Sequence, residues 1–344
     1  MQRASRCDAS ETHTKGFEPR ETSVNESRNR VRIPVGAVLE RSERLRPEIH
    51  YRRRREVRYG RTHRHPATGY SLMRYLARTA DGRPLVGDDD GVVPLTALYP
   101  DASSVHDALP RATTGLRDPA DATADRVPRD GVTFGPPLDD PGKLFGIGLN
   151  YADHAADLSE EPPEEPASFF KPATAATGPG GPIRLPPREQ SDCVTAEAEL
   201  AVVIGRTCRN VAVDDAESVI AGYTPVIDVT AEDVLARNPR FLTRAKSYDT
   251  FLVLGPHIAV PKADGALDDI EVRTVVNGEV RARNTLANMQ FSPRELVAYH
   301  SGVMTLEPGD VISTGTPGAH PIEPGDLVRA EVDRIGPVGA DVVR

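Results

Sequence analysis

The chain has 344 residues, a formal net charge of −9 and three cysteines, Cys7, Cys193 and Cys208. A chain of this length can bury a sizeable core and still carry a small appendage. None of its apolar runs approaches the roughly 20 residues of a membrane-spanning helix, and its N-terminus lacks the apolar core of a signal peptide. The cysteine count is odd and the cysteines show no metal-ligand spacing, so we expect a reducing, cytoplasmic compartment in which disulfide bonds are not required. We expect no membrane partner.

The first 72 residues are predicted to be a disordered, arginine-rich extension. Residues 1–65 hold 17 basic and nine acidic side chains, a balance of +8, and they lack convincing periodicity. An arginine-rich arm could contact nucleic acid, but the extension has neither a folded binding module nor interleaved aromatic residues, so nucleic acid is not the expected partner. We expect Met73, which opens a strand-like run, to be the natural start.

The rest of the chain is predicted to contain a small N-terminal domain at 73–109, a Pro- and Gly-rich linker at 110–141 and a main domain at 142–344. Short strands with scattered helices favour an α+β class over a doubly wound sheet. The sequence contains neither a GxGxxG nor a Walker motif, so it does not indicate a nucleotide cofactor. Strands are expected at 144–149, 200–204, 222–226, 252–254, 271–276, 311–313 and 327–332, and helices at 152–158, 213–216, 231–237 and 293–301.

Glu197 and Glu199 are separated by one residue and lead directly into the apolar run 200–204. At this spacing both side chains lie on the same face of a strand. Two carboxylates that face a buried interior cannot both stay ionised without a counterion, which a divalent cation would supply. Because all the ligand atoms would be oxygens, the pattern favours Mg²⁺, with Mn²⁺ or Ca²⁺ possible, over zinc. The spacing alone fits equally well an exposed edge strand with solvated glutamates.

Three further features lie downstream of this pair. Asp228 ends an apolar segment, and Thr230 is a plausible N-cap for a helix that follows. Lys246 opens the run Lys-Ser-Tyr-Asp-Thr-Phe. The Gly-, Thr- and Pro-rich loop in 308–318 follows a short strand, and its backbone N–H groups and hydroxyls could hold a substrate carboxylate. Each of these patterns is also typical of an ordinary cap, surface lysine or tight turn.

Taken together, the short motifs from about residue 143 to about residue 338 resemble the fumarylacetoacetate hydrolase family, in its order and spacing. The branch that they resemble contains 2-hydroxyhepta-2,4-diene-1,7-dioate isomerases and acylpyruvases. The resemblance implies a strand-rich mixed β-roll as the catalytic domain of a homodimer. The motifs are Gly-Leu-Asn-Tyr-Ala-Asp-His at 148–154, Phe-Lys-Pro at 170–172, Glu-Ala-Glu-Leu at 197–200, Asp-Val-Thr-Ala-Glu-Asp at 228–233, Lys-Ser-Tyr-Asp at 246–249, Asn-Gly-Glu at 277–279, Pro-Gly-Asp at 308–310 and Thr-Gly-Thr-Pro at 314–317.

The resemblance also implies roles for individual residues. His154, oriented by Asp157 on a short helix, would be the base, and Lys246 would hold the C2 oxygen of the substrate. The implied metal ligands are Glu197, Glu199 and Asp228. The implied substrate-binding residues are Lys171, Thr314, Gly315 and Thr316.

Two departures from the family pattern bear on the substrate. The Arg and Gln that help bind and polarise the substrate in fumarylacetoacetate hydrolases are here Glu232 and Leu235. The acidic residue three positions after the lid histidine, usually Glu, is Asp157. We therefore expect a family member that does not cleave fumarylacetoacetate.

Several functions fit the implied site. A 2-oxo acid could chelate the metal, which would stabilise the enolate formed during cleavage, decarboxylation or proton removal. The first expectation is hydrolytic C–C cleavage of an acylpyruvate-type substrate, with His154 activating water. The alternatives are decarboxylation or isomerisation of a 2-oxo diacid, such as 2-hydroxyhepta-2,4-diene-1,7-dioate or oxaloacetate, and a catalytically silent binding protein with the same fold.

Overall fold

The computed structural model describes residues 73–152, 163–261 and 267–344 of the chain. These residues belong to one compact unit that spans Pro66–Arg344. They are rich in strands, with a few short helices between them, which confirms the predicted α+β class. The expected disordered extension, and most of the helix expected at 152–158, lie outside the described residues.

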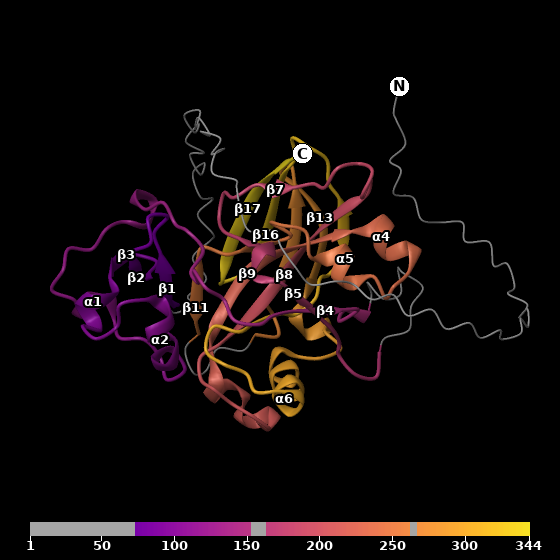
Figure 1. Cartoon of the computed structure of the whole chain (residues 1–344). Coiled ribbons are helices and arrows are strands. Elements are labelled where there is room, and N and C mark those ends of the chain that lie inside the picture. Colours follow the sequence, from indigo (N-terminus) through magenta and orange to yellow (C-terminus); the bar gives the residue numbers. More distant parts are fainter. Residues whose placement is uncertain (1–72, 153–162, 262–266) are drawn as a thin grey trace, which may run out of the picture. The chain divides into compact units, whose positions relative to one another are not determined.

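The larger sheet has 12 strands and forms the centre of the unit (Figure 1). Its main path runs β3-β2-β1-β11-β9-β8-β14-β4-β5, with β10, β6 and β15 attached at the side. Most neighbours are antiparallel, but β14 and β4 are parallel, so the sheet is mixed. The strands are β1 (Arg74–Arg78), β2 (Pro84–Asp88), β3 (Gly91–Pro94), β4 (Leu144–Gly148), β5 (Ala167–Lys171), β6 (Ala176–Thr177), β8 (Val194–Ile204), β9 (Ile220–Ala231), β10 (Leu252–Leu254), β11 (His257–Val260), β14 (Val311–Ser313) and β15 (Ala319–Pro321).

A second sheet of five strands packs on one face of the first. Valines from its strands and the even-numbered residues of β8 share one hydrophobic cluster, because alternate side chains of β8 point to opposite faces. The strand order is β13-β12-β16-β17-β7. These strands are β7 (Ile183–Arg184), β12 (Glu271–Val276), β13 (Glu279–Thr285), β16 (Leu327–Val332) and β17 (Gly336–Val343).

The expected small N-terminal β region is present, and its strands extend the larger sheet. β1 pairs with β11 in an antiparallel register that places Leu76 opposite Ile258. Two helices follow, α1 (Leu95–Leu98) and α2 (Val105–Ala112), and α2 begins at a capping box between Ser104 and Asp107. The side chains of this region share a hydrophobic cluster with Ala201 and other residues of the large sheet.

The remaining helices lie between the strands of the main domain. The longest is α6 (Pro293–Val303), which has a capping box and a proline in its first turn. The others are α4 (Glu232–Arg237), α5 (Leu242–Lys246) and the 3-10 helices Pro119–Asp121, Arg129–Gly131, Ala173–Ala175, Val213–Val219 and Leu286–Asn288.

The central pair of strands, β8 and β9, is longer than the sequence predicts. Strands were expected only at 200–204 and 222–226, yet the ladder extends from Val194 opposite Ala231 to Ile204 opposite Ile220. The prediction that Asp228 ends a strand and that Thr230 caps a helix is wrong, because both residues lie within β9. The helix α4 begins without a side-chain cap. Pairing with β8 outweighs the local cap signal at Thr230.

Other predicted elements agree closely with the structure. The strands expected at 252–254, 271–276, 311–313 and 327–332 have the bounds of β10, β12, β14 and β16. The helices expected at 231–237 and 293–301 correspond to α4 and α6, with ends that differ by one or two residues.

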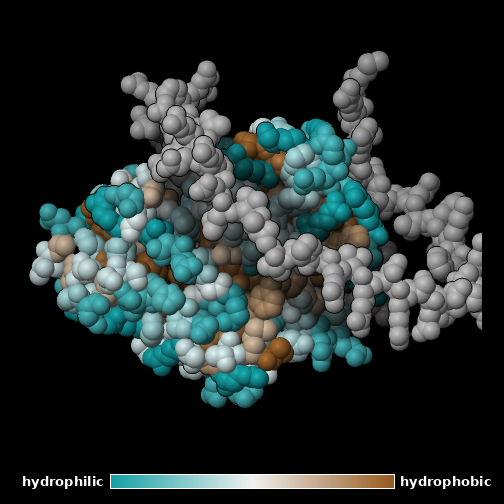
Figure 2. Space-filling model, viewed as in Figure 1, coloured by the Kyte–Doolittle hydropathy of each residue, from teal (hydrophilic) through white to brown (hydrophobic). Residues whose placement is uncertain are grey.

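Figure 2 shows hydrophilic side chains over much of the visible face, interrupted by small hydrophobic areas. None of the helices among the described residues has the length and apolar character needed to span a membrane.

Candidate active site

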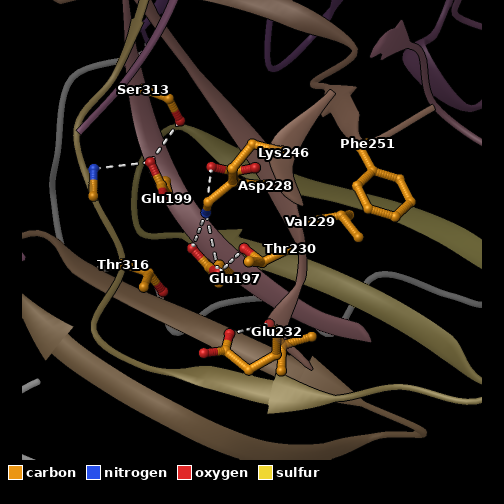
Figure 3. Close-up of polar contacts among 12 residues, drawn as sticks. Glu197, Glu199, Asp228, Val229, Thr230, Glu232, Lys246, Phe251, Ser313 and Thr316 are labelled. Atoms are coloured by element: carbon orange, nitrogen blue, oxygen red, sulfur yellow. Dashed lines mark hydrogen bonds and ion pairs between the residues drawn. The ribbon is translucent and has the colours of Figure 1, made fainter. Parts of the chain in front are cut away.

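Three buried carboxylates converge on the face of β8 and β9 that points away from the second sheet (Figure 3). Glu197 lies directly opposite Asp228 in the ladder, and Glu199 follows two residues along β8. One oxygen from each of the three groups lies within 4.8 Å of the others. The expected shared face of Glu197 and Glu199 is therefore confirmed, and the exposed edge strand is excluded because both side chains are buried in a central strand.

Lys246 is the cation nearest to this cluster. It ends α5 and its side chain is buried, so it is not a surface lysine. Its ammonium group donates to both oxygens of Glu197, at 3.0 and 3.2 Å, and to Asp228 Oδ2 at 3.1 Å. The ammonium also lies 5.2 Å from the centre of the Phe169 ring. Lys246 therefore offsets part of the negative charge from within the cluster.

Lys171, the last residue of β5, contacts Asp228 from the other side. Its ammonium group lies 2.5 Å from Asp228 Oδ1 and is almost completely buried. It also donates to three backbone carbonyl oxygens, those of Val229, Lys246 and Phe251, at 3.2, 2.7 and 2.8 Å, respectively. These contacts satisfy the three protons of the ammonium group. They hold Lys171 against Asp228 and the nearby backbone, whereas the sequence predicts a substrate-binding role.

The Thr-Gly-Thr loop after β14 supports Glu199. The Ser313 hydroxyl and the Gly315 backbone N–H both donate to Glu199 Oε2, at 2.5 and 2.8 Å. The Thr314 hydroxyl donates to the Leu200 carbonyl oxygen. The loop groups that were expected to grip a substrate carboxylate are thus engaged with β8, while Thr316 lies beside the cluster (Figure 3).

Two buried residues, Asn150 and Tyr151, follow β4. The Asn150 side-chain amide donates to the carbonyl oxygens of Thr314 and Phe291, at 2.7 and 3.0 Å. Tyr151 is fully buried, and its hydroxyl has no hydrogen-bond partner among the described residues. Burial first, and then the charge of Glu199, raise the pKa of this hydroxyl, so it stays protonated and can donate.

Burial and the neighbouring charges both shift the pKa values of the cluster. Burial, followed by the charges of Asp228 and Glu197, raises the pKa of Glu199 to about 8. Burial alone would raise the pKa of Asp228, but the charges of Lys171 and Lys246 outweigh it and hold that pKa below its usual value. Burial lowers the pKa of Lys171, whereas the carboxylates outweigh burial at Lys246 and raise its pKa.

The donor set fits a divalent cation. Three carboxylates from rigid strands supply only oxygen atoms, as Mg²⁺, Mn²⁺ and Ca²⁺ prefer. Two like charges directly opposite each other in a ladder, such as Glu197 and Asp228, destabilise it unless a counter-charge is present. Lys246 and Lys171 supply two positive charges against the three negative charges of the fully ionised carboxylates. The arrangement therefore forms a candidate divalent-metal site.

Two predicted site residues, His154 and Asp157, lie outside the described residues, so their placement stays a prediction. The sequence analysis gave no role in the site to Thr230, Ser313 and Asn150, which donate to Glu197, to Glu199 and to the 314 loop, respectively. The available signal was position: Thr230 is two residues after Asp228, and Ser313 directly precedes the Thr-Gly-Thr motif.

The family model described as fumarylacetoacetate (FAA) hydrolase C-terminal matches residues 143–343 of the chain. An uncharacterized protein of Archaeoglobus fulgidus is 45% identical over 214 residues, which cover 61% of this chain and 82% of that protein. The mitochondrial oxaloacetate tautomerase FAHD2A of Bos taurus is 34% identical over 301 residues, which cover 81% of this chain and 93% of the relative.

Solved structures show the same similarity. The 5-carboxymethyl-2-hydroxymuconate delta-isomerase from Mycobacterium smegmatis is 37% identical, with a TM-score of 0.62, over 80% of this chain and 99% of its own. Maleylpyruvate hydrolase from Sphingobium sp. SYK-6, solved in complex with manganese(II) ion and pyruvate, is 30% identical, with a TM-score of 0.63, over 78% of this chain and 98% of its own.

Proposed function

Because the chain belongs to the fumarylacetoacetate hydrolase family, we propose that it is a divalent-metal-dependent enzyme that hydrolyses a C–C bond of acylpyruvate-type 2-oxo acids. The observation that carries the proposal is the convergence of Glu197, Glu199 and Asp228 with Lys246 on one buried face. The complex of the related maleylpyruvate hydrolase with manganese(II) and pyruvate supports both the metal and the substrate class.

The proposed site residues have separate roles toward the metal and the substrate. Glu197, Glu199 and Asp228 would hold Mg²⁺ or Mn²⁺, which when bound polarises the 2-oxo acid and stabilises negative charge on it. Lys246 is the cation available for the charge that develops at the C2 oxygen. The proposed hydrogen-bond donors to the substrate are the Thr316 hydroxyl, which donates to the Gly318 carbonyl oxygen in this structure, and the Tyr151 hydroxyl, which has no partner among the described residues.

In the hydrolytic step, His154, oriented by Asp157, would take a proton from water as the water oxygen attacks the C4 carbonyl carbon. The C3–C4 bond then breaks, and its electron pair forms the enolate of pyruvate, with the negative charge on the C2 oxygen. The proton that His154 took from water passes to C3, which gives pyruvate, and the acyl fragment leaves as a carboxylic acid. Lys171, which contacts Asp228 and backbone carbonyl groups, would position the metal ligand rather than bind the substrate.

A second candidate function is isomerisation, keto–enol exchange or decarboxylation of a 2-oxo acid at the same site. The observation that favours it is the 34% identity to an oxaloacetate tautomerase over 81% of this chain. These reactions need the carboxylates and Lys246 but no water nucleophile. Under this alternative, His154 is not required to activate water.

The test is to incubate the full chain, loaded with Mg²⁺ or Mn²⁺, with acylpyruvates, oxaloacetate and hydroxymuconate-type diacids. Hydrolysis releases pyruvate and a carboxylic acid, decarboxylation releases CO₂, and isomerisation changes the absorbance without a change in mass. With an acylpyruvate we expect hydrolysis. If no compound is consumed with either metal, the proposed function is wrong. Light scattering on the same sample tests the predicted homodimer.

A further inference from the structure

Glu232 extends the acidic cluster along the strands. On β9, Asp228 and Thr230 face the cluster, and Glu232 follows as the first residue of α4. On β8, Thr195 continues the row of Glu197, and its hydroxyl lies 3.4 Å from a carboxylate oxygen of Glu232. Figure 3 shows the Glu232 side chain on the same side of the strands as Glu197.

The two ends of this face differ in burial. In one direction along β8, the face continues with Ala201 and Val203, which are fully buried in a hydrophobic cluster. In the other direction Glu199, Glu197 and Thr195 are 1%, 7% and 4% exposed, and Glu232 beyond them is partly exposed. The tail of a 2-oxo acid whose head contacts the cluster therefore leads toward the Glu232 carboxylate.

Glu232 forms no ion pair with a basic side chain within the part of the chain that the structure describes, whereas Lys171 and Lys246 both pair with Asp228. Four carboxylates and two ammonium groups have a formal charge of −2, which one divalent cation brings to zero. A 2-oxo acid with one carboxylate then adds one negative charge to the site, and a dicarboxylate adds two.

From this geometry we infer that Glu232 is a specificity-determining residue that favours 2-oxo acids with an uncharged tail over those with a second carboxylate. The inference rests on the proposed function and specifies the substrate class of the same site. A terminal carboxylate would lie close to the Glu232 carboxylate, and like charges repel strongly at a partly buried position. A tail that ends in a hydroxyl or amide can instead donate a hydrogen bond to Glu232.

The test measures the binding of two inert ligands to the full chain loaded with Mn²⁺ by calorimetry. These ligands, 2-oxopentanoate and 2-oxoglutarate, have the same carbon chain and differ only in a terminal methyl or carboxylate. We expect the wild-type protein to bind 2-oxopentanoate more tightly. The isosteric change Glu232→Gln should tighten 2-oxoglutarate binding by about 10-fold and change 2-oxopentanoate binding little.

The matched control is Asp233→Asn, which removes the same charge from the next residue. Asp233 contacts the Ser191 hydroxyl and Arg237, so its loss should not change the ratio of the two dissociation constants. Thermal unfolding of both variants reveals any general effect on the fold, since an acidic residue in the first turn also stabilises a helix. With the wild-type protein, 2-oxoglutaramate, in which an amide replaces the terminal carboxylate, should bind at least as tightly as 2-oxopentanoate.

The outcomes separate the inference from the function on which it rests. If the metal-loaded protein binds neither 2-oxo acid, the proposed function fails and the inference fails with it. If both ligands bind but the ratio is the same in wild type and Glu232→Gln, the inference is overturned while the proposed function stands. A wild-type preference for 2-oxoglutarate over its amide would overturn it in the same way.

Discussion

One face of the β8–β9 ladder has two halves of opposite character. In one half, Ala201 and Val203 of β8 and Ala221 of β9 are buried in a hydrophobic cluster that includes Leu109 of α2. In the other half, the same strands present the carboxylates of the candidate metal site. The backbone pairing continues through both halves, and the one register shift lies at the far apolar end, between residues 203 and 204.

The two halves differ in what burial does to stability. Burial of apolar side chains stabilises the first half by roughly 25 cal/mol for each Å² removed from water. Burial of charges in the second half costs free energy unless each charge has a partner. The apolar half and the second sheet therefore hold the backbone in place, which allows the carboxylates to stay close together. We expect substitutions in the acidic half to affect activity most, and those in the apolar half to affect stability alone.

The largest expected effect comes from Glu199→Ala in the acidic half. It removes one metal ligand, so metal-dependent turnover should fall by about 10³-fold or more, since the metal supplies several kcal/mol of stabilisation. Mn²⁺ should raise the melting temperature of the wild-type protein but not that of the variant. The matched change Glu199→Gln keeps the acceptor for Ser313 and Gly315 and should lose metal binding with the metal-free fold intact. Normal metal binding in both variants would refute the site.

The second-largest expected effect is on turnover, through the proposed base His154. In the described part of the chain, no histidine converges with the three carboxylates. His154→Ala should lower kcat on an identified substrate by about 10²–10⁴-fold with little loss of metal affinity. Asp157→Ala should approach the same loss, whereas Asp157→Glu should be tolerated. Near-normal turnover of His154→Ala would favour isomerisation or decarboxylation over hydrolysis.

Substitution of Lys171 tests whether the acidic half needs its buried cations for stability. Lys171→Met leaves Asp228 and three carbonyl oxygens without this donor, so the free energy of unfolding should fall by about 3–5 kcal/mol. The matched control is Lys143→Met, since Lys143 pairs with Asp310 but is partly exposed and should lose less. Urea unfolding measures both. A higher KM with unchanged stability would instead support the substrate-binding role predicted from the sequence.

The amino-acid sequence predicts the parts of the site that depend on local spacing, but not those that depend on distant contacts. The spacing of Glu197 and Glu199 fixes their common face, because strand periodicity is a local property. The roles of Lys171 and Ser313 depend on contacts with residues 58–114 positions away, and no local pattern contains them. At Thr230 the local pattern predicted a helix cap, but the residue pairs with β8 within a strand instead.

The fold shows the same division between local and distant information. Strands bounded by turn residues, such as β12 and β16, were predicted with their observed bounds. The N-terminal strands were expected, but the pairing of β1 with β11 joins residues 180–186 positions apart. Such pairings depend on tertiary packing, which alternation of apolar residues does not specify.

The smallest expected effect is that of Val203→Ala in the apolar half. Val203 is fully buried between β9 and β14, and loss of two methyl groups there should lower the free energy of unfolding by about 1–3 kcal/mol. Metal affinity and kcat/KM should stay within about 2-fold, because sites that share no contacts behave additively. The matched control is Val303→Ala, which makes the same change at a side chain that is 56% exposed and should leave stability nearly unchanged. Urea unfolding and Mn²⁺ titration measure the two quantities. A clear loss of metal affinity in Val203→Ala would show that the apolar half tunes the carboxylates directly, and the two halves could then no longer be treated as independent.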